Sequence, residues 1–176
     1  MRPEAILLPI ALPAAIGILC FLIPDRAKRV KESLAILAAL ANLALAIILF
    51  SKQERLTYPW APEWGIDFSF RLYDFSSFVI LAAAGFGLAI ALYSWSFMKG
   101  KKRQRQYYAY LLLTLAQVNG AVLSDNLAVL LIFWESLLLT LYGMIAIGAA
   151  KASGPREGSN KTAIKAFTIA GITDLC

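Results

Sequence analysis

Histidine is absent from the 176-residue chain, and cysteine occurs only twice, as Cys20 and Cys176. Each cysteine lies in an apolar segment with no metal-ligand spacing around it. A structural zinc site, a histidine-ligated haem and a Cys/His nucleophile pair are therefore excluded within this chain. The sequence also contains no nucleotide-binding loop and no nucleophile–base pair. It predicts no cofactor and no catalytic residue, so catalysis by this chain alone is the least expected function.

Charged residues are scarce as well, at 16% of the chain, whereas 60% of the residues are apolar and the mean hydropathy is +0.67. The apolar residues form long blocks, which is typical of a membrane protein and not of a soluble domain. The net charge of +6 does not indicate nucleic-acid binding, because the basic residues lie in short segments between the apolar blocks. The chain is therefore expected to lie in a lipid bilayer.

The apolar blocks predict an all-α, polytopic bundle of transmembrane helices in a single membrane domain, 1–176. A helix needs about 20 residues to cross about 30 Å of hydrocarbon. Five full spans and a truncated sixth are expected, at about 4–23, 33–50, 75–98, 107–124, 127–150 and 162–176. The sixth block would be roughly 22 Å long as a helix, so the chain is interpreted as the N-terminal fragment of a longer subunit. Asn42, the only strongly polar residue of the second span, is expected to form an interhelical hydrogen bond.

Residues 51–74 form the one sizeable extramembrane segment, which is rich in proline and aromatic residues. From Ile66 to Tyr73 the residues alternate: Ile66, Phe68, Phe70 and Leu72 share one side. This period of two predicts a short β-strand lying over the helix ends, with aromatic side chains at the membrane interface.

The basic residues predict the orientation of the chain. Segments 24–32, 99–106 and 151–161 carry 4, 5 and 3 lysines or arginines, whereas the opposite side carries four. By the positive-inside rule, the N-terminus is outside and these three loops are cytoplasmic, in a multi-pass protein of the cell membrane. A lipid-headgroup site in 99–106 is an alternative interpretation of its charge, although topology alone accounts for it.

Glu135 is the principal candidate for function. It lies within the apolar block 127–150, which contains no other ionisable side chain, and roughly 12 Å from the nearer end of that helix. A charge at this depth costs at least a few kcal/mol, so intramembrane carboxylates are rare and typically belong to ion or proton pathways. The alternative is a permanently protonated Glu135 that only links helices by a hydrogen bond.

Four further polar residues are expected near the depth of Glu135 or on the path to it. Asp125 and Asn126 form a very tight turn, so the fourth and fifth helices are predicted to be neighbours. Gln117, Asn119 and Asp174 then lie near the level of Glu135, the two amides as supporting groups. If Asp174 faces Glu135, the two carboxylates would share one exchangeable proton. Lys165 lies nearer the cytoplasmic side, where it either snorkels to the surface or begins a polar chain.

Residues 66–175 resemble the antiporter-like membrane subunits of respiratory complex I, a family that also includes subunits of group 4 membrane-bound hydrogenases, formate hydrogenlyase and Mrp cation/proton antiporters. The most specific matches are SDNLAVLLIFWE, with an acidic-Asn turn followed by Trp-Glu in the fifth helix, and KAF in the sixth. The resemblance implies that Glu135 is coupled to a lysine on a seventh helix, beyond this sequence. It also matches Lys165 to a family lysine at the cytoplasmic start of helix six, and Asp174 to an acidic position found in some branches.

Three functions follow from these observations. The favoured one is a proton- or Na+/H+-translocating subunit of an oxidoreductase complex, driven by electron transfer in partners that comprise other membrane subunits and a peripheral redox arm. In it Glu135, Lys165 and Asp174 form the ion pathway. The second is a stand-alone cation/proton antiporter subunit of the same fold. The third is a scaffold subunit in which Glu135 is only structural.

Overall fold

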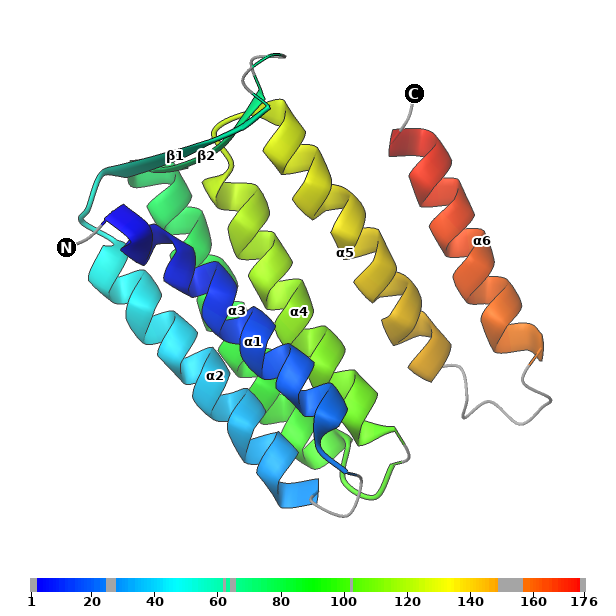
Figure 1. Ribbon diagram of the computed structural model, residues 1–176. Helices are drawn as coiled ribbons and strands as arrows, with labels where there is room; N and C mark the ends of the chain where they lie inside the picture. Colours follow the sequence, from blue (N-terminus) through cyan, green and yellow to red (C-terminus); the bar gives the residue numbers. More distant parts are fainter. Residues whose placement is uncertain are drawn as a thin grey trace.

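The computed structural model describes residues 3–24, 28–61, 63, 66–101, 103–148 and 157–174. Helices that pack side by side dominate the structure, and a two-stranded hairpin lies across one end of them (Figure 1). In chain order the elements are η1 (Pro3–Leu7, a 3-10 helix), α1 (Leu8–Leu22), α2 (Lys28–Leu49), β1 (Glu54–Ala61), β2 (Ile66–Leu72), α3 (Asp74–Phe97), α4 (Gln104–Leu123), α5 (Leu127–Gly148) and α6 (Glu157–Asp174).

The polytopic helical architecture expected from hydropathy is confirmed. Within the described residues, four segments are long and apolar enough to cross a membrane: Glu4–Leu22, Arg29–Leu49, Asp74–Phe97 and Leu127–Ile147. The helices α2 and α6 begin at Lys28 and Glu157, earlier than the expected spans at 33 and 162. Hydropathy locates the hydrocarbon crossing, whereas a helix continues into the polar layer as long as its backbone hydrogen bonds can form. Lys31 and Glu32, expected in a loop, are consequently buried in the first turns of α2.

Helix α4 is the centre of the bundle, and it packs against α1, α2, α3 and α5 (Figure 1). It is not among the four apolar segments, because it carries several polar side chains that face other helices and not the surroundings. Asn119 shows this most clearly, since its side chain is fully buried. A central helix can be more polar than its neighbours when its hydrogen-bonding groups are satisfied inside the protein.

Asn119 is bonded to two helices at once. Pro13 has no N–H, so the carbonyl of Pro9, four residues earlier, loses its helical partner. Asn119 Nδ2 donates to that carbonyl at 2.8 Å and to Asn42 Oδ1 at 3.1 Å. The expected interhelical hydrogen bond of Asn42 is thereby confirmed, and one side chain of α4 joins α1 to α2.

Two aromatic rings lie on two glycines where α4 meets α5. A Cβ atom placed on Gly120 of α4 would lie 2.3 Å from the ring of Phe133 on α5. In the reciprocal contact, a Cβ atom on Gly143 of α5 would lie 2.4 Å from the ring of Tyr110 on α4. Real Cβ atoms do not approach a ring so closely, so only glycine allows this packing. The predicted proximity of the fourth and fifth helices is confirmed.

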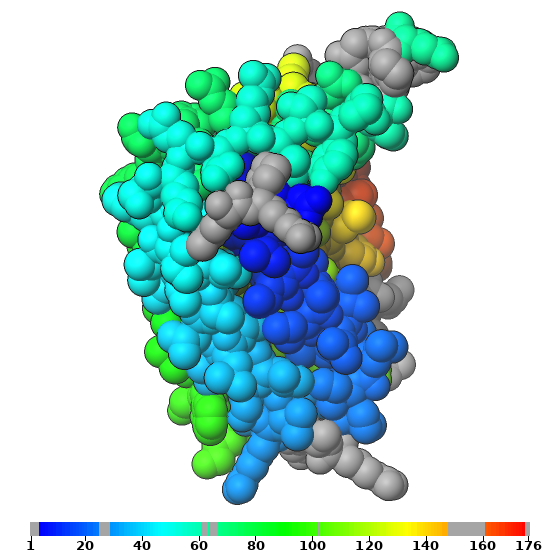
Figure 2. Space-filling model, turned by 60° about the vertical axis from the view of Figure 1, so that its left-hand side comes forward, coloured from blue at the N-terminus to red at the C-terminus, as the bar shows by residue number. Residues whose placement is uncertain are grey.

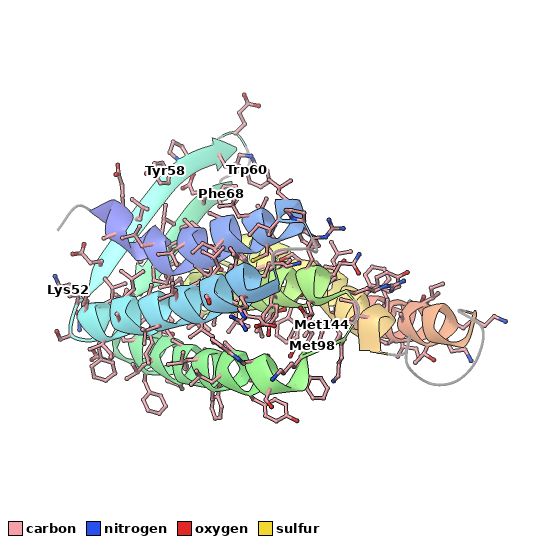
Figure 3. All side chains as sticks on the ribbon, turned by 90° about the horizontal axis from the view of Figure 1, so that it is seen from below. Lys52, Tyr58, Trp60, Phe68, Met98 and Met144 are labelled. Carbon is pink, nitrogen blue, oxygen red and sulfur yellow. The ribbon has the colours of Figure 1, made fainter. Side chains whose placement is uncertain are left out.

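The predicted strand is present as β2, and it pairs with a second strand, β1, which the alternation did not indicate. The strands are antiparallel, with Tyr58 opposite Phe68 and a bulge between Pro59 and Ala61. Trp60 lies in that bulge and packs on the Phe68 ring at 4.9 Å (Figure 3). The space-filling view shows the hairpin as a cap over one end of the bundle, above η1 and α1 (Figure 2).

Candidate functional site

Glu135 lies within α5, eight residues after the first residue of the helix. It follows Phe133 by two residues, which is about 200° around the helix axis. Since the Phe133 ring packs on Gly120, this rotation turns Glu135 away from α4. Its side chain is exposed in the described part of the chain. The Glu135 carboxylate thus lies well inside α5, on a helix face that α4 does not cover.

Asp174 on α6 lies level with this region of α5. The indole Nε1 of Trp134 donates to Asp174 Oδ2 at 3.0 Å. One further ring contact joins the same two helices, between Tyr142 and Phe167 with centroids 6.0 Å apart. The hydrogen bond places Asp174 beside the residue that precedes Glu135, so both carboxylates lie near one level of the bundle. The partner of Asp174 is an indole, and no described hydrogen bond joins the two acidic side chains.

The two amides expected to support Glu135 have other partners. Gln117 accepts a hydrogen bond from the Thr140 hydroxyl at 2.9 Å, and Asn119 bonds to Pro9 and Asn42 as described above. No hydrogen bond among the described residues links either amide to Glu135. Lys165 is exposed on α6. The structure thus gathers Trp134, Glu135 and Asp174 at one level, while the amides stabilise the bundle around α4; their influence on Glu135 stays a prediction.

The turn between α4 and α5 contributes two residues that sequence reasoning treated only as a short connection. Asp125 forms an ion pair with Arg55 of β1 at 2.8 Å and lies 4.0 Å from Arg71 of β2. Its backbone N–H donates to the carbonyl of Ser69 at 3.0 Å. The feature that points to this role of Asp125 is the pair Arg55 and Arg71, which lie directly opposite each other on β1 and β2. Two like charges side by side on a sheet favour a carboxylate between them.

Asn126 caps α5 and holds the hairpin at the same time. Its Oδ1 accepts from the backbone N–H of Val129 at 2.8 Å, which is the N-cap interaction. Its Nδ2 donates to the Asp67 carbonyl and to Ser69 Oγ, the latter at 3.0 Å. The Asn126 side chain therefore fixes the first turn of α5 and holds the hairpin beside it. Because Glu135 lies on α5, Asn126 also helps to position Glu135.

Asn126→Ala is expected to destabilise the protein by about 1–2 kcal/mol, because the N-cap and both bonds to the hairpin are lost together. Thermal unfolding of the purified protein measures this change. Asn126→Asp keeps the N-cap acceptor but not the amide donor, so it should lie between the wild type and the alanine variant. Equal stability of all three proteins would show that the turn is not held by this side chain.

A groove of about 350 Å³ runs beside this region, lined by Thr114 of α4 and, on α5, by apolar residues and Thr140. Its α5 residues include Trp134, Leu138 and Met144. The described residues contain no group of three or more acidic or cysteine side chains that could hold a metal. The ionisable side chains at this level of α5 and α6 are Glu135 and Asp174.

No family model matches this chain. Over 80 residues it is 39% identical to a Na(+)/H(+) antiporter subunit of Alkalihalophilus pseudofirmus, and over 79 residues it is 37% identical to a Na(+)/H(+) antiporter subunit of Staphylococcus haemolyticus. Each match covers 45% of this chain and 10% of the relative, so only a small part of those proteins is represented.

The fold recurs in a solved structure. One chain of respiratory complex I from Thermus thermophilus with bound NADH superimposes with a TM-score of 0.67. The superposition covers 80% of this chain and 28% of that one, at 23% identity. At this identity the likeness establishes a shared arrangement of helices.

Proposed function

We propose that this chain forms part of a proton- or Na+/H+-translocating subunit in a redox-driven membrane complex related to complex I or the group 4 hydrogenases. The chain is a relative of the antiporter-like membrane subunits, the group that includes subunits of bacterial Na+/H+ antiporters. The observation that supports this function most strongly is the carboxylate of Glu135 at mid-depth of α5, beside the Trp134–Asp174 hydrogen bond. Carboxylates at this depth of a membrane helix are typical of proton and ion pathways.

In this proposal α4 is a fifth membrane span and α6 begins a sixth. Helix α4 has 20 residues, roughly 30 Å, which equals the hydrocarbon thickness. Gln117 and the Asn119 amide NH2 do not oppose insertion, because they are hydrogen-bonded to α5, α1 and α2. The C-terminal ends of α1, α3 and α5, which precede the three basic segments in the sequence, lie at the end of the bundle away from the hairpin (Figure 1). That end is cytoplasmic by the positive-inside rule.

Three ionisable side chains have distinct roles in the proposed path. Glu135 takes up and releases the transported proton, and Asp174 lies at the same level on α6. Lys165 lies nine residues before Asp174, roughly 13 Å nearer the cytoplasmic end, as the group on the input side. Gln117 and Asn119 act on this path by fixing α4 against α5, α1 and α2, since their hydrogen bonds run to those helices.

A stand-alone cation/proton antiporter is the second candidate. The observation that favours it is the identity of the relatives found by sequence, which are antiporter subunits. In both candidates the partners are other membrane subunits, and only the redox-driven complex includes a peripheral arm that transfers electrons.

Proton movement in proteoliposomes separates the two candidates. The complete subunit with its partners is reconstituted, and internal pH is followed with a fluorescent dye. A redox-driven complex is expected to move protons only after the electron donor is supplied. Sodium-dependent proton movement without any donor would instead establish the antiporter, and absence of movement under both conditions would contradict both.

A further inference from the structure

The outer face of α3 is apolar from end to end. The helix packs mainly against α2 and α4, and its large exposed side chains recur at helical spacing: Phe75, Phe78, Phe86, Ile90, Tyr93 and Phe97. With 24 residues the helix is roughly 36 Å long, which exceeds the 30 Å of hydrocarbon, so its ends reach the headgroup layers. Tyr93, Trp95 and Phe97, exposed by 66%, 49% and 46%, therefore lie at the membrane interface.

Cations follow these rings directly. The ammonium of Lys101 lies 2.8 Å from the centroid of the Phe97 ring, which stacks on Tyr93 at 5.5 Å. Lys99 and Arg103 are exposed on the same loop. A cation held over a ring has a fixed position, here at the C-terminal end of α3. The end of α3 thus presents positive charge at the level at which lipid phosphates lie.

The loop that bears these cations is held from inside the protein. Met98 and Gln104, on either side of the loop, are both buried, and Gln104 Nε2 donates to the Met98 carbonyl. Between them Arg103 has φ +65°, in the left-handed region that a residue other than glycine rarely adopts. Met98 is labelled in Figure 3, where the molecule is seen from below. The buried bond ties the two ends of this segment together, and Lys99 and Arg103 are exposed on it.

We propose that Lys99, Lys101 and Arg103 bind the phosphate of an anionic phospholipid, whose acyl chain lies along the exposed face of α3. An amphipathic ligand fits this end of α3, because the cations continue into an apolar stripe that enters the hydrocarbon. Free phosphate would use only the charges, and an acidic protein segment would not use the stripe. At the opposite end of the stripe, Arg71 faces Asp125 and the Tyr73 ring.

Lipid retention by the complete subunit in its complex tests this proposal without any measurement of transport. The purified protein is incubated with vesicles of phosphatidylcholine and phosphatidylglycerol, extracted in mild detergent, and its bound lipid is quantified by native mass spectrometry. The wild type is expected to be enriched in phosphatidylglycerol. Lys99→Gln, Lys101→Gln and Arg103→Gln should each weaken retention roughly fivefold, equivalent to about 1 kcal/mol per charge. Phe97→Ala should weaken it too, because the Lys101 contact and part of the apolar stripe are lost.

Arg29→Gln is the matched control, since Arg29 is an exposed cation of α2 at the same end of the bundle. Equal loss in this control would show diffuse attraction to the membrane surface and overturn the proposal. Displacement of phosphatidylglycerol by inorganic phosphate would also overturn it, by identifying a site for the free anion. Release of a partner subunit with lipid retention unchanged would identify the loop as a protein interface instead. Unchanged thermal unfolding of the variants excludes a folding defect as the cause.

Discussion

Replacing Glu135 with glutamine is expected to abolish ion translocation while the subunit remains in the membrane and in its complex. Glutamine has nearly the same volume and can still form a hydrogen bond, but it cannot take up and release a proton. The loss should be roughly 100-fold or more, the range found when a proton-transferring group is removed. Electron-donor-driven proton movement in proteoliposomes measures transport, and the amount of intact complex after purification measures assembly.

Glu4→Gln is a suitable control, because Glu4 is an exposed carboxylate at the hairpin end, outside the proposed path. It should transport normally. Normal transport by Glu135→Gln would contradict the relay role and favour the scaffold function, with Glu135 as a structural side chain. Loss of assembly together with transport would likewise assign Glu135 to structure.

A methyl group on Gly120 is expected to destabilise the bundle by about 1–3 kcal/mol. The added Cβ would lie 2.3 Å from the Phe133 ring, so the ring or the whole of α5 must move. Because α5 carries Glu135, transport should fall together with stability. Thermal unfolding and proton movement of Gly120→Ala measure the two effects, and Gly143→Ala should behave alike through the Tyr110 ring.

Gly85→Ala separates this packing effect from the general properties of glycine in a helix. A Cβ atom at Gly85 meets nothing within 4 Å, and alanine is the better helix former, so this variant should be as stable as the wild type or slightly more stable. In the double variant Gly120→Ala/Phe133→Leu, the smaller side chain should restore part of the stability, as a positive coupling between touching residues. Equal destabilisation by Gly85→Ala would refute the packing explanation.

Much of the fold could be predicted because membrane helices leave a local signal. The apolar blocks indicated the helices, and the alternation from Ile66 indicated β2. The strand β1 was missed, since its sequence between Glu54 and Ala61 contains a proline and a bulge that interrupt the period of two. The beginnings of α2 and α6 were also missed, because charged first turns outside the hydrocarbon lower the hydropathy without ending the helix.

The candidate site could be predicted only in part. Glu135 stood out through its rarity, and its depth followed from counting residues along the helix. The hydrogen bond from Trp134 to Asp174 could not be predicted, since it depends on how α6 is rotated against α5. The roles of Asp125 and Asn126 were hidden for a similar reason: their partners Arg55, Asp67 and Ser69 lie more than fifty residues away in the chain.

By itself, the amino-acid sequence determined that this protein is a bundle of membrane helices with a carboxylate inside one of them. Hydropathy depends on each segment and its solvent alone, so no knowledge of the neighbours is needed. Only the tertiary structure decided that α4 is the centre of the bundle, that Asn119 bonds to the carbonyl freed by Pro13, and that Glu135 faces away from α4. Those facts depend on which helices touch and at what rotation, and packing between distant segments decides both.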